Sequence, residues 1–394
     1  EQYRHATYSP VDYYQEALRR DPSDIRNNNA MGLWLLRRGQ FGEAERYFRK
    51  AVETWTERNP NPYDGEPLYN LGLCLKYQHK VDEAYAYFYK ACWNAAWQDA
   101  GYFSLAQISA GRGDWECALD EINRSLLRNV NSLRARHLKA TTLRHLGQKE
   151  EALAWIESSL VLDPFNYGCS FEKYLLTGDE SLLKALSQQM RGEAHNYEEL
   201  VTDYISNLCW KEAETVATWA IRLKVSDCTL LHYYLAWIKG MLGQEEEAKQ
   251  LIQEAETLPQ DTFFPNTLEA QEALTYCTHI LLHTPKAWHL LGNILYDKRI
   301  YDEAIKAWET SIKQDNTFPT VFRNLALAYY NKQGKKEEAV RLMERAYELD
   351  RSDARVLMEL DQLYKRQNVA YETRRSHLHA NMEAVCQRDD LYLE

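Results

Sequence analysis

The stretch Leu68-Tyr-Asn-Leu-Gly-Leu-Cys-Leu75, a polar turn, and Glu83-Ala-Tyr-Ala-Tyr-Phe-Tyr-Lys-Ala91 decide the fold of this chain. In the first segment, apolar residues recur at three- and four-residue steps, which places them on one face of a helix. The second segment repeats this spacing at Ala84, Phe88 and Ala91. Gly72 and Ala84 are small where two helix backbones must come close, and Phe88 is large enough to fill the gap that they leave. Neither short helix can bury its apolar face alone, so the pair needs similar neighbours.

Such neighbours recur along the chain at a regular distance. The small residue of the first helix returns at steps of 34 residues, at Gly72, Ala106 and Ala140, and again at Gly292 and Ala326. The signature of the second helix returns with it, as Ala44/Phe48/Ala51, Ala118/Ile122/Ser125, Ala152/Ile156/Ser159 and Ala304/Trp308/Ser311. The agreement among many copies makes this pattern specific.

A helix–turn–helix period of 34 residues with this pattern resembles that of tetratricopeptide repeat (TPR) proteins. The resemblance implies an all-α fold, a right-handed superhelical α-solenoid of about ten TPR units including degenerate ones. A solenoid grows by adding units to one stack, so the 394 residues need not divide into separate globular domains.

The repeat register predicts six segments. They are residues 1–23 (the back half of a truncated repeat), 24–164 (N-terminal repeats), 165–195 (a degenerate repeat), 196–258 (middle repeats), 259–285 (an irregular connector helix) and 286–394 (C-terminal repeats and closing helices). Because the chain begins in mid-repeat and without Met, we expect the natural protein to extend further toward the N-terminus, and less strongly toward the C-terminus.

Four irregular features are expected within these segments. The prolines and glycine of residues 59–65 cannot continue a helix and predict a loop insertion. A shortened helix pair is expected around Gly178, and one residue is inserted in the turn near Gly334. We expect a helix at 266–282 without a clear partner, and closing helices at 353–366 and 372–387.

Composition limits the function classes. A formal net charge of −11 argues against general nucleic-acid binding, because phosphate contacts need a basic surface. No apolar run approaches the length of a membrane span. The eight cysteines form no Cys-x-x-Cys pair, which favours a reducing, cytoplasmic setting.

Several short runs resemble one bacterial family more closely than TPR proteins in general. These runs are Tyr-Arg-His-Ala-Thr-Tyr at 3–8, Glu-Ala-Leu-Arg-Arg-Asp-Pro at 16–22, Leu-Tyr-Asn-Leu-Gly-Leu-Cys-Leu at 68–75, Trp-Asn-Ala-Ala-Trp at 93–97 and Leu-Lys-Ala at 138–140. The whole chain resembles the C-terminal TPR region of large bacterial YphG-type proteins, whose N-terminal half carries a domain of unknown function. In that family the N-terminal half looks like a β-sandwich of carbohydrate-active type, so the resemblance implies a sugar-related setting. It supplies no catalytic residue.

The TPR resemblance also implies a ligand-binding groove, lined by the first helix of each pair. Counting from the small residue, the groove-facing side chains of the first four repeats are Arg26, Asn29, Glu66, Tyr69, Asn70, Lys76, Tyr77, Phe103, Gln107, Arg134, His137, Arg144 and His145. Aromatic rings, amides and guanidinium groups suit an extended peptide, an acidic segment or a sugar ring. The alternative is that these are simply solvated residues.

The C-terminal repeats resemble the carboxylate-clamp TPRs that hold chaperone C-termini. Asn293 and Asn324 stand at the two asparagine positions, and Arg355 at one basic position. However, His289 replaces the first lysine of the clamp and Glu359 replaces its final arginine. An acid in that place would repel a carboxylate, which favours asparagine as an ordinary TPR residue here.

Neither a zinc site nor a catalytic site is indicated by the sequence. His279 and His283 have the four-residue spacing that places two imidazoles on one helix face, but two ligands make a poor zinc site. There is no Gly-rich phosphate loop, nucleophile elbow or paired carboxylate motif. We therefore predict no metal, no cofactor and no catalytic residue in this chain.

The leading hypothesis is a non-catalytic interaction scaffold, which binds a peptide segment or its own N-terminal domain in the concave groove. The alternative is an accessory region of a carbohydrate-active enzyme, in which the groove aromatics stack on sugar. A third alternative is homo-oligomerisation through residues 165–195 and 259–285.

Overall fold

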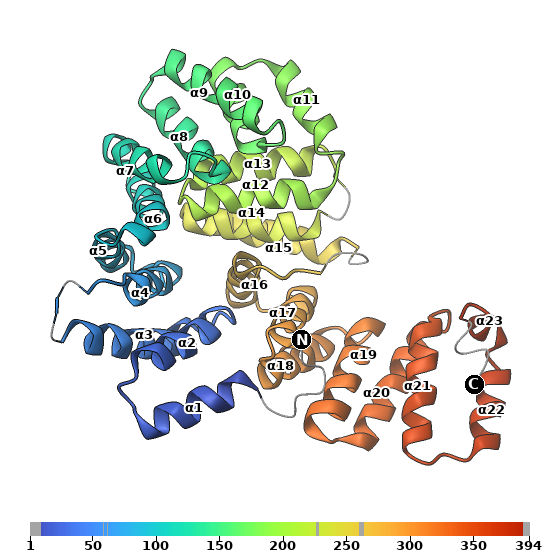
Figure 1. The fold of residues 1–394 in the computed structure, drawn as a ribbon. Coiled ribbons are helices and arrows are strands. Elements are labelled where there is room, and N and C mark those ends of the chain that lie inside the picture. Colours follow the sequence, from blue (N-terminus) through green and yellow to red (C-terminus); the bar gives the residue numbers. More distant parts are fainter. Residues whose placement is uncertain (1–8, 58, 61, 226–227, 260–263, 389–394) are drawn as a thin grey trace. The chain divides into compact units, whose positions relative to one another are not determined.

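The chain folds into successive antiparallel helix pairs (Figure 1). The computed structural model describes residues 9–57, 59–60, 62–225, 228–259 and 264–388, and within these ranges it contains helices and no strands. The fold is therefore all-α, as predicted. The helices form two compact units, Glu1–Leu231 with Met241–Gly243 (unit 1) and His232–Gly240 with Gln244–Glu394 (unit 2).

Unit 1 begins with a single helix, which packs against the first of several hairpins. We call the first helix of each hairpin A and the second B. The helices are α1 (Pro10–Arg20), the pairs α2 (Ile25–Leu36) and α3 (Phe41–Thr56), α4 (Glu66–Tyr77) and α5 (Val81–Ala91), α6 (Gln98–Gly111) and α7 (Trp115–Arg128), α8 (Leu133–His145) and α9 (Lys149–Leu162), α10 (Tyr167–Thr177) and α11 (Glu180–Gln189), α12 (Ala194–Ser206) and α13 (Trp210–Arg222), and the short 3-10 turn η1 (Ala95–Trp97).

The small and large residues of the repeat meet inside each hairpin, as the sequence predicts. A Cβ atom on Gly72 would lie 2.8 Å from ring atoms of Phe88, too close to be accommodated without movement of the ring. Phe88 is fully buried. The same contact recurs between Gly32 and Phe48 and between Gly292 and Trp308. This interlock fixes the distance between the A and B helices.

The predicted loop insertion is held in place by two tryptophans. Trp55 Nε1 donates to the Asp64 carbonyl oxygen at 3.0 Å, and Trp97 Nε1 lies 3.3 Å from Asp64 Oδ1. Residues 58 and 61 of this region lie outside the described residues.

The expected shortened pair around Gly178 corresponds to α10 and α11. Gly178 ends α10 in the left-handed conformation, with φ 69°, and Asp179 caps the start of α11 through a hydrogen bond to the Ser181 amide. A glycine can adopt this conformation at little cost, so the chain reverses within two residues.

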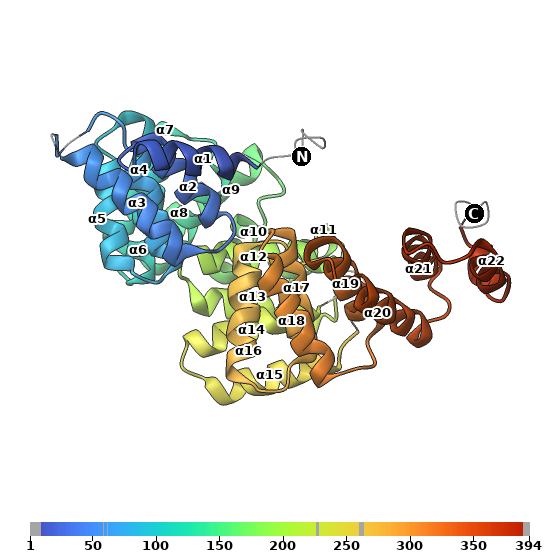
Figure 2. The same cartoon turned by 90° about the horizontal axis from the view of Figure 1, so that it is seen from below.

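Unit 2 contains the remaining hairpins, with α14 extending across the boundary of the two units; in Figures 1 and 2 α17 and α18 lie side by side. Its helices are α14 (Thr229–Met241) and α15 (Glu245–Thr257), the single α16 (Leu268–Ile280), α17 (Pro285–Asp297) and α18 (Tyr301–Gln314), α19 (Pro319–Ala328) and α20 (Lys336–Leu349), then α21 (Ala354–Arg366), α22 (Tyr371–His379) and α23 (Met382–Val385).

Two expectations for unit 2 are corrected. The helix predicted at 266–282 does have partners: α16 packs against α17, and a Cβ on Gly240 of α14 would meet the Tyr276 hydroxyl. The helix predicted at 372–387 is broken into α22 and α23 around Asn381, whose side chain donates to the His377 carbonyl oxygen at 2.7 Å.

The residue inserted near Gly334 is absorbed by a π-helical turn. The helix that begins with α19 continues as a π-helix, η2 (Tyr329–Gln333), and ends at Gly334 with φ 67°. A π-turn accommodates one additional residue without breaking the helix. Tyr329 donates to Glu309 at 2.7 Å, and Tyr364 donates to Glu344 at 2.6 Å, so the same contact recurs 35 residues later.

Candidate functional site

The inner face of unit 1 comprises the sides of α4, α6 and α8 that carry Lys76, Gln107 and Arg134. The C-terminal end of α12 lies against this face. Lys76 Nζ donates to the Ser206 carbonyl oxygen at 2.8 Å and to Gln107 Oε1 at 2.6 Å. Gln107 Nε2 donates to Asn207 Oδ1 at 2.9 Å. The inner face therefore already binds a polypeptide segment, which belongs to the same chain and lies 100 to 130 residues further on.

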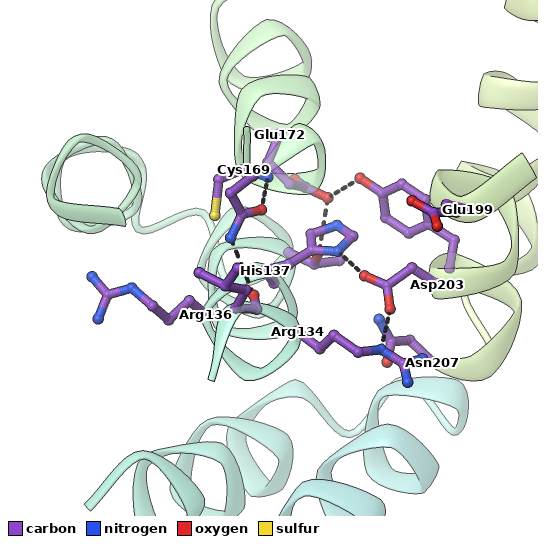
Figure 3. Close-up of polar contacts among 12 residues, drawn as sticks. Arg134, Arg136, His137, Cys169, Glu172, Glu199, Asp203 and Asn207 are labelled. Carbon is purple, nitrogen blue, oxygen red and sulfur yellow. Dashed lines mark hydrogen bonds and ion pairs between the residues drawn. The ribbon is translucent and has the colours of Figure 1, made fainter. Parts of the chain in front are cut away.

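Where α12 meets α8, Asp203 is the central hydrogen-bond acceptor (Figure 3). Its two carboxylate oxygens lie 2.6 Å from Arg134 Nε and 2.7 Å from His137 Nδ1. His137 is 1% exposed and its ring packs edge-on against Tyr204. Burial by itself raises the pKa of Asp203, but the bonds from His137 and Arg134 outweigh it and hold that pKa below its usual value.

Glu172, from α10, is fully buried beside this group (Figure 3). It accepts hydrogen bonds from Thr141 at 2.8 Å, from Tyr204 at 2.8 Å and from Arg144 Nε at 2.5 Å. A buried carboxylate is tolerated when its lone pairs are filled in this way. Burial raises the pKa of Tyr204, and the charge of Glu172 raises it further.

Glu212, from α13, completes the network at the C-terminal end of α8. It accepts from Arg144 at 2.8 Å and lies 2.7 Å from His145 Nε2. The His145 ring stacks on Trp115, with centroids 3.8 Å apart. Burial opposes ionisation of Glu212, but the hydrogen bonds from His145 and Arg144 lower its pKa to about 2.

Three carboxylates from α10, α12 and α13 thus meet cationic side chains of α8. Charge-assisted hydrogen bonds of this kind give strong and directional recognition of one element by another. Across the described ranges, no group of three or more His, Cys, Asp or Glu side chains is placed to hold a metal ion.

The structure places the predicted groove residues of unit 1 at several depths. Tyr69, Tyr77, Phe103 and Arg144 are partly buried, and Arg134 is exposed. The expectation of a solvent-facing groove is wrong for four others, which are buried: Asn29, Asn70, Gln107 and His137.

Two physical reasons account for this burial. Asn29 donates to Glu66 at 2.9 Å and accepts from Asn70 at 3.0 Å, so the amides of α2 and α4 satisfy one another. Gln107 and His137 are covered by the end of α12. Ligand binding by these residues stays a prediction.

In unit 2 the residues at the clamp positions also bind the chain itself. Asn324 Nδ2 donates to Asn293 Oδ1 at 3.0 Å, and Asn293 is buried. Glu359 accepts from Arg323 Nε at 2.6 Å and from Arg355 Nε at 3.3 Å. The Glu359 carboxylate therefore binds the guanidinium groups of Arg323 and Arg355, in the way that a ligand carboxylate would bind in a clamp.

The two histidines considered for zinc lie on different elements. His279 is on α16 and its Nδ1 lies 2.6 Å from the Thr275 carbonyl oxygen. His283 lies beyond Ile280, where α16 ends, so the two rings do not share a helix face as the spacing suggested. His289 is buried, and burial lowers its pKa to about 3.

Sequence reasoning missed the acidic half of the network in unit 1. The missed acids are Glu172, Asp203 and Glu212, and the amide of Asn207, which accepts from Gln107, was missed as well. The sequence carries no signal for them, because an exposed acid beside a buried residue is ordinary on these helices, as Glu247 beside Ala248 shows. The basic partners could not be assigned, because the contacts span 28 to 69 residues.

None of the described helices combines the length and the apolar character that a membrane span requires.

Models of known protein families match several parts of this chain. Tetratricopeptide repeat models match residues 24–92, 133–166 and 321–357, and a TPR repeat model matches residues 292–333. Among solved structures, a tetratricopeptide repeat protein from Parabacteroides merdae is 17% identical, with 81% of this chain and 98% of that chain covered and a TM-score of 0.35.

Two further structures show the same type of likeness. The TPR domain of P58(IPK) is 16% identical, with 88% of this chain and 100% of that chain covered and a TM-score of 0.27. YrrB, described as a TPR protein with an unusual peptide-binding site, is 17% identical, with 60% and 96% covered and a TM-score of 0.22. The matched repeats and the interlocked helix pairs together show that this chain contains tetratricopeptide repeats.

Proposed function

We propose that this chain is a non-catalytic protein-interaction scaffold that binds a partner polypeptide on the inner face of unit 1. The observation that carries the proposal is the set of contacts from Lys76, Gln107 and Arg134 to residues 203–207. These side chains bind a helix end through a lysine, an amide and a guanidinium group. The same chemistry suits an acidic or amide-rich segment of another protein.

Lys76, Gln107 and Arg134 are bonded to residues 203–207 of the chain itself, so the partner segment in this proposal lies further toward the N-terminus. It follows the first part of α4 and the same side of α2, which we include in the inner face. The end of α12 reaches α4 at Lys76, close to the C-terminal end of that helix. By the repeat count, Leu33 and Leu73 belong to the same inner side and are partly buried, and Arg26 is exposed. A peptide or the protein's own N-terminal domain would meet apolar contacts flanked by a guanidinium group here.

Site-specific photocrosslinking in the native cell tests this placement. A photoreactive amino acid at position 33 or 73 is expected to crosslink to a protein partner. The matched control is position 86, because Ala86 is exposed on the B helix α5 and lies off the inner side. Crosslinks of equal yield at all three positions, or at position 86 alone, would show that the partner does not bind on the inner face.

A loss of partner binding in the variant Arg26→Ala would support the same conclusion. Arg26 is exposed, so its removal leaves the core intact. Tyr69 is unsuitable for such a test, because its ring stacks on Trp97 with centroids 4.9 Å apart and truncation would disturb the fold. The carbohydrate-related alternative stays a prediction, which screening of this chain against a panel of saccharides would test.

A further inference from the structure

Two pairs of aromatic rings lie near the loop that joins α3 to α4. The first pair is Trp55 and Tyr63, with ring centroids 5.6 Å apart. The second pair is Tyr89 and Trp93, with ring centroids 6.4 Å apart. The side chain of Asn94 donates to the Tyr63 carbonyl oxygen, so the residue that follows Trp93 is bonded to the first pair. We call these four rings the aromatic platform.

Three of the four rings are largely exposed. The exposed fraction is 79% for Tyr63, 58% for Trp93 and 52% for Tyr89. A single exposed ring is ordinary, but apolar groups that are exposed together mark an interaction site. Tyr89 belongs to the B helix α5 and Trp93 to the turn after it, so the platform is separate from the inner face, which the A helices form.

The chain holds the platform in place without a ligand. The Trp55 indole donates to the Asp64 carbonyl oxygen at 3.0 Å, which fixes the ring beneath Tyr63. Asn94 accepts from the Ala96 amide at 2.9 Å while it donates to Tyr63. Rings that are already ordered lose little conformational entropy when a partner binds.

The polar groups of the platform that remain available are neutral donors. Asp64 Oδ1 accepts from the Glu66 amide at 3.0 Å, and both ends of the Asn94 side chain are bonded to the chain. In contrast, no acceptor among the described residues binds the indole N–H of Trp93 or the hydroxyl groups of Tyr63 and Tyr89. The platform therefore offers ring faces together with donors that have no partner within the described residues.

We propose that the aromatic platform binds a proline-rich segment of a partner protein in the polyproline II conformation. Proline has no N–H, and a polyproline II backbone makes no internal hydrogen bonds, so its carbonyl oxygens are free to accept from the platform. Its pyrrolidine rings pack on aromatic side chains.

The same inventory of polar groups disfavours a glycan at this place. Sugar hydroxyls donate as well as accept, so a glycan also needs acceptors beside the rings. Asp64 and Asn94 are the carboxylate and the amide that lie between the two ring pairs, and both are engaged with the chain itself.

The test uses a synthetic, uncharged peptide of about ten residues with proline at two of every three positions. A polyproline II chain rises about 3.1 Å per residue, so this peptide is about 30 Å long and can reach both ring pairs. A matched peptide carries serine in place of every proline. Fluorescence anisotropy with the full chain should show at least about tenfold tighter binding of the proline-rich peptide.

Two substitutions of Trp93 separate the ring from its donor. Trp93→Ala removes both and should weaken binding of the proline-rich peptide by about tenfold. Trp93→Phe keeps a ring but lacks the indole N–H, and should weaken binding by about threefold. Tyr371→Ala is the matched control and should bind like the unmodified chain, because Tyr371 is also 58% exposed but lies on α22 in unit 2. Circular dichroism should show all variants folded.

Equal affinity for the two peptides, or full affinity in either Trp93 variant, would overturn the proposal. So would binding of cellohexaose that Trp93→Ala abolishes, without binding of the proline-rich peptide, since the occupant would then be a glycan. Self-association of the chain that light scattering detects and Trp93→Ala abolishes would likewise overturn it, in favour of a second copy.

Discussion

At the scale of single residues, the network of unit 1 holds three carboxylates that water would otherwise solvate. Glu172, Asp203 and Glu212 are each bonded to a cation of α8. A buried ion pair adds little net stability compared with an apolar pair, but removing one partner leaves an uncompensated charge and typically costs about 3–5 kcal/mol. These pairs therefore mainly specify how α10, α12 and α13 pack against α8.

Lowering the pH should weaken the packing of α13 against α8, because it protonates Glu212. Its pKa is lowered from 4.5 to about 2 in the folded chain, so its ionised form stabilises the fold at pH above about 4.5, by an amount on the order of 3 kcal/mol. That contribution is lost as the pH falls toward 2. The free energy of unfolding, measured in urea, should therefore fall more steeply between pH 5 and 2 in the unmodified chain than in Glu212→Gln.

The control for this pH series is Glu116→Gln, because Glu116 is exposed on α7. Its profile should follow that of the unmodified chain. A Glu212→Gln profile that is equally steep would show that the Arg144 and His145 contacts do not depress this pKa.

At the scale of helices, the hairpins of unit 2 differ in the residues that pack between their A and B helices. In α17 and α18, Gly292 receives the Trp308 ring. In the last hairpin, the position of the small residue carries Asp361 of α21, which is buried and accepts from Arg374 of α22, with Nε and Oδ1 2.9 Å apart. The exchange explains why the repeat pattern fades toward the C-terminus while the helices continue.

The turns between the A and B helices of unit 2 provide a matched pair of substitutions. Arg299 has a left-handed backbone, with φ 63°, and Gly334 has φ 67°. Arg299→Gly should raise the free energy of unfolding by about 0.5–1 kcal/mol, because a residue with a Cβ is strained there. Gly334→Ala should lower it by about 1 kcal/mol for the same reason. Thermal and urea unfolding of both variants measures these changes, and equal signs would contradict the backbone argument.

At the scale of the molecule, the sequence predicted what depends on local periodicity and missed what depends on distant contacts. Gly72 and Phe88 lie 16 residues apart in one hairpin, so their packing could be predicted from spacing alone. The approach of Ser206 to Lys76 depends on small rotations accumulated over many helices, including the degenerate pair α10 and α11. The residues near Lys76 carry no pattern that indicates these accumulated rotations. The sequence therefore predicts an open groove.

Truncation shows how far unit 1 depends on these contacts. The repeat register alone predicts residues 24–164 as one set of N-terminal repeats, which a fragment of residues 9–164 contains in full. We expect this fragment to melt at least about 5 °C below residues 9–225, because Gln107, His137 and Arg144 lose their partners on α10, α12 and α13. A fragment of residues 24–231, which lacks α1 but keeps α12, should lose less. Equal melting temperatures for 9–164 and 9–225, measured by circular dichroism, would contradict this account.

The occupation of the inner face by α12 also has a consequence for molecular evolution. Lys76, Gln107, Arg134 and the segment 203–207 behave as receptor and ligand that are inherited in one gene. A substitution on either side is tolerated only when the other side compensates. Across related genomes these positions should change together, and ancestral reconstruction should find the paired replacements on the same branches.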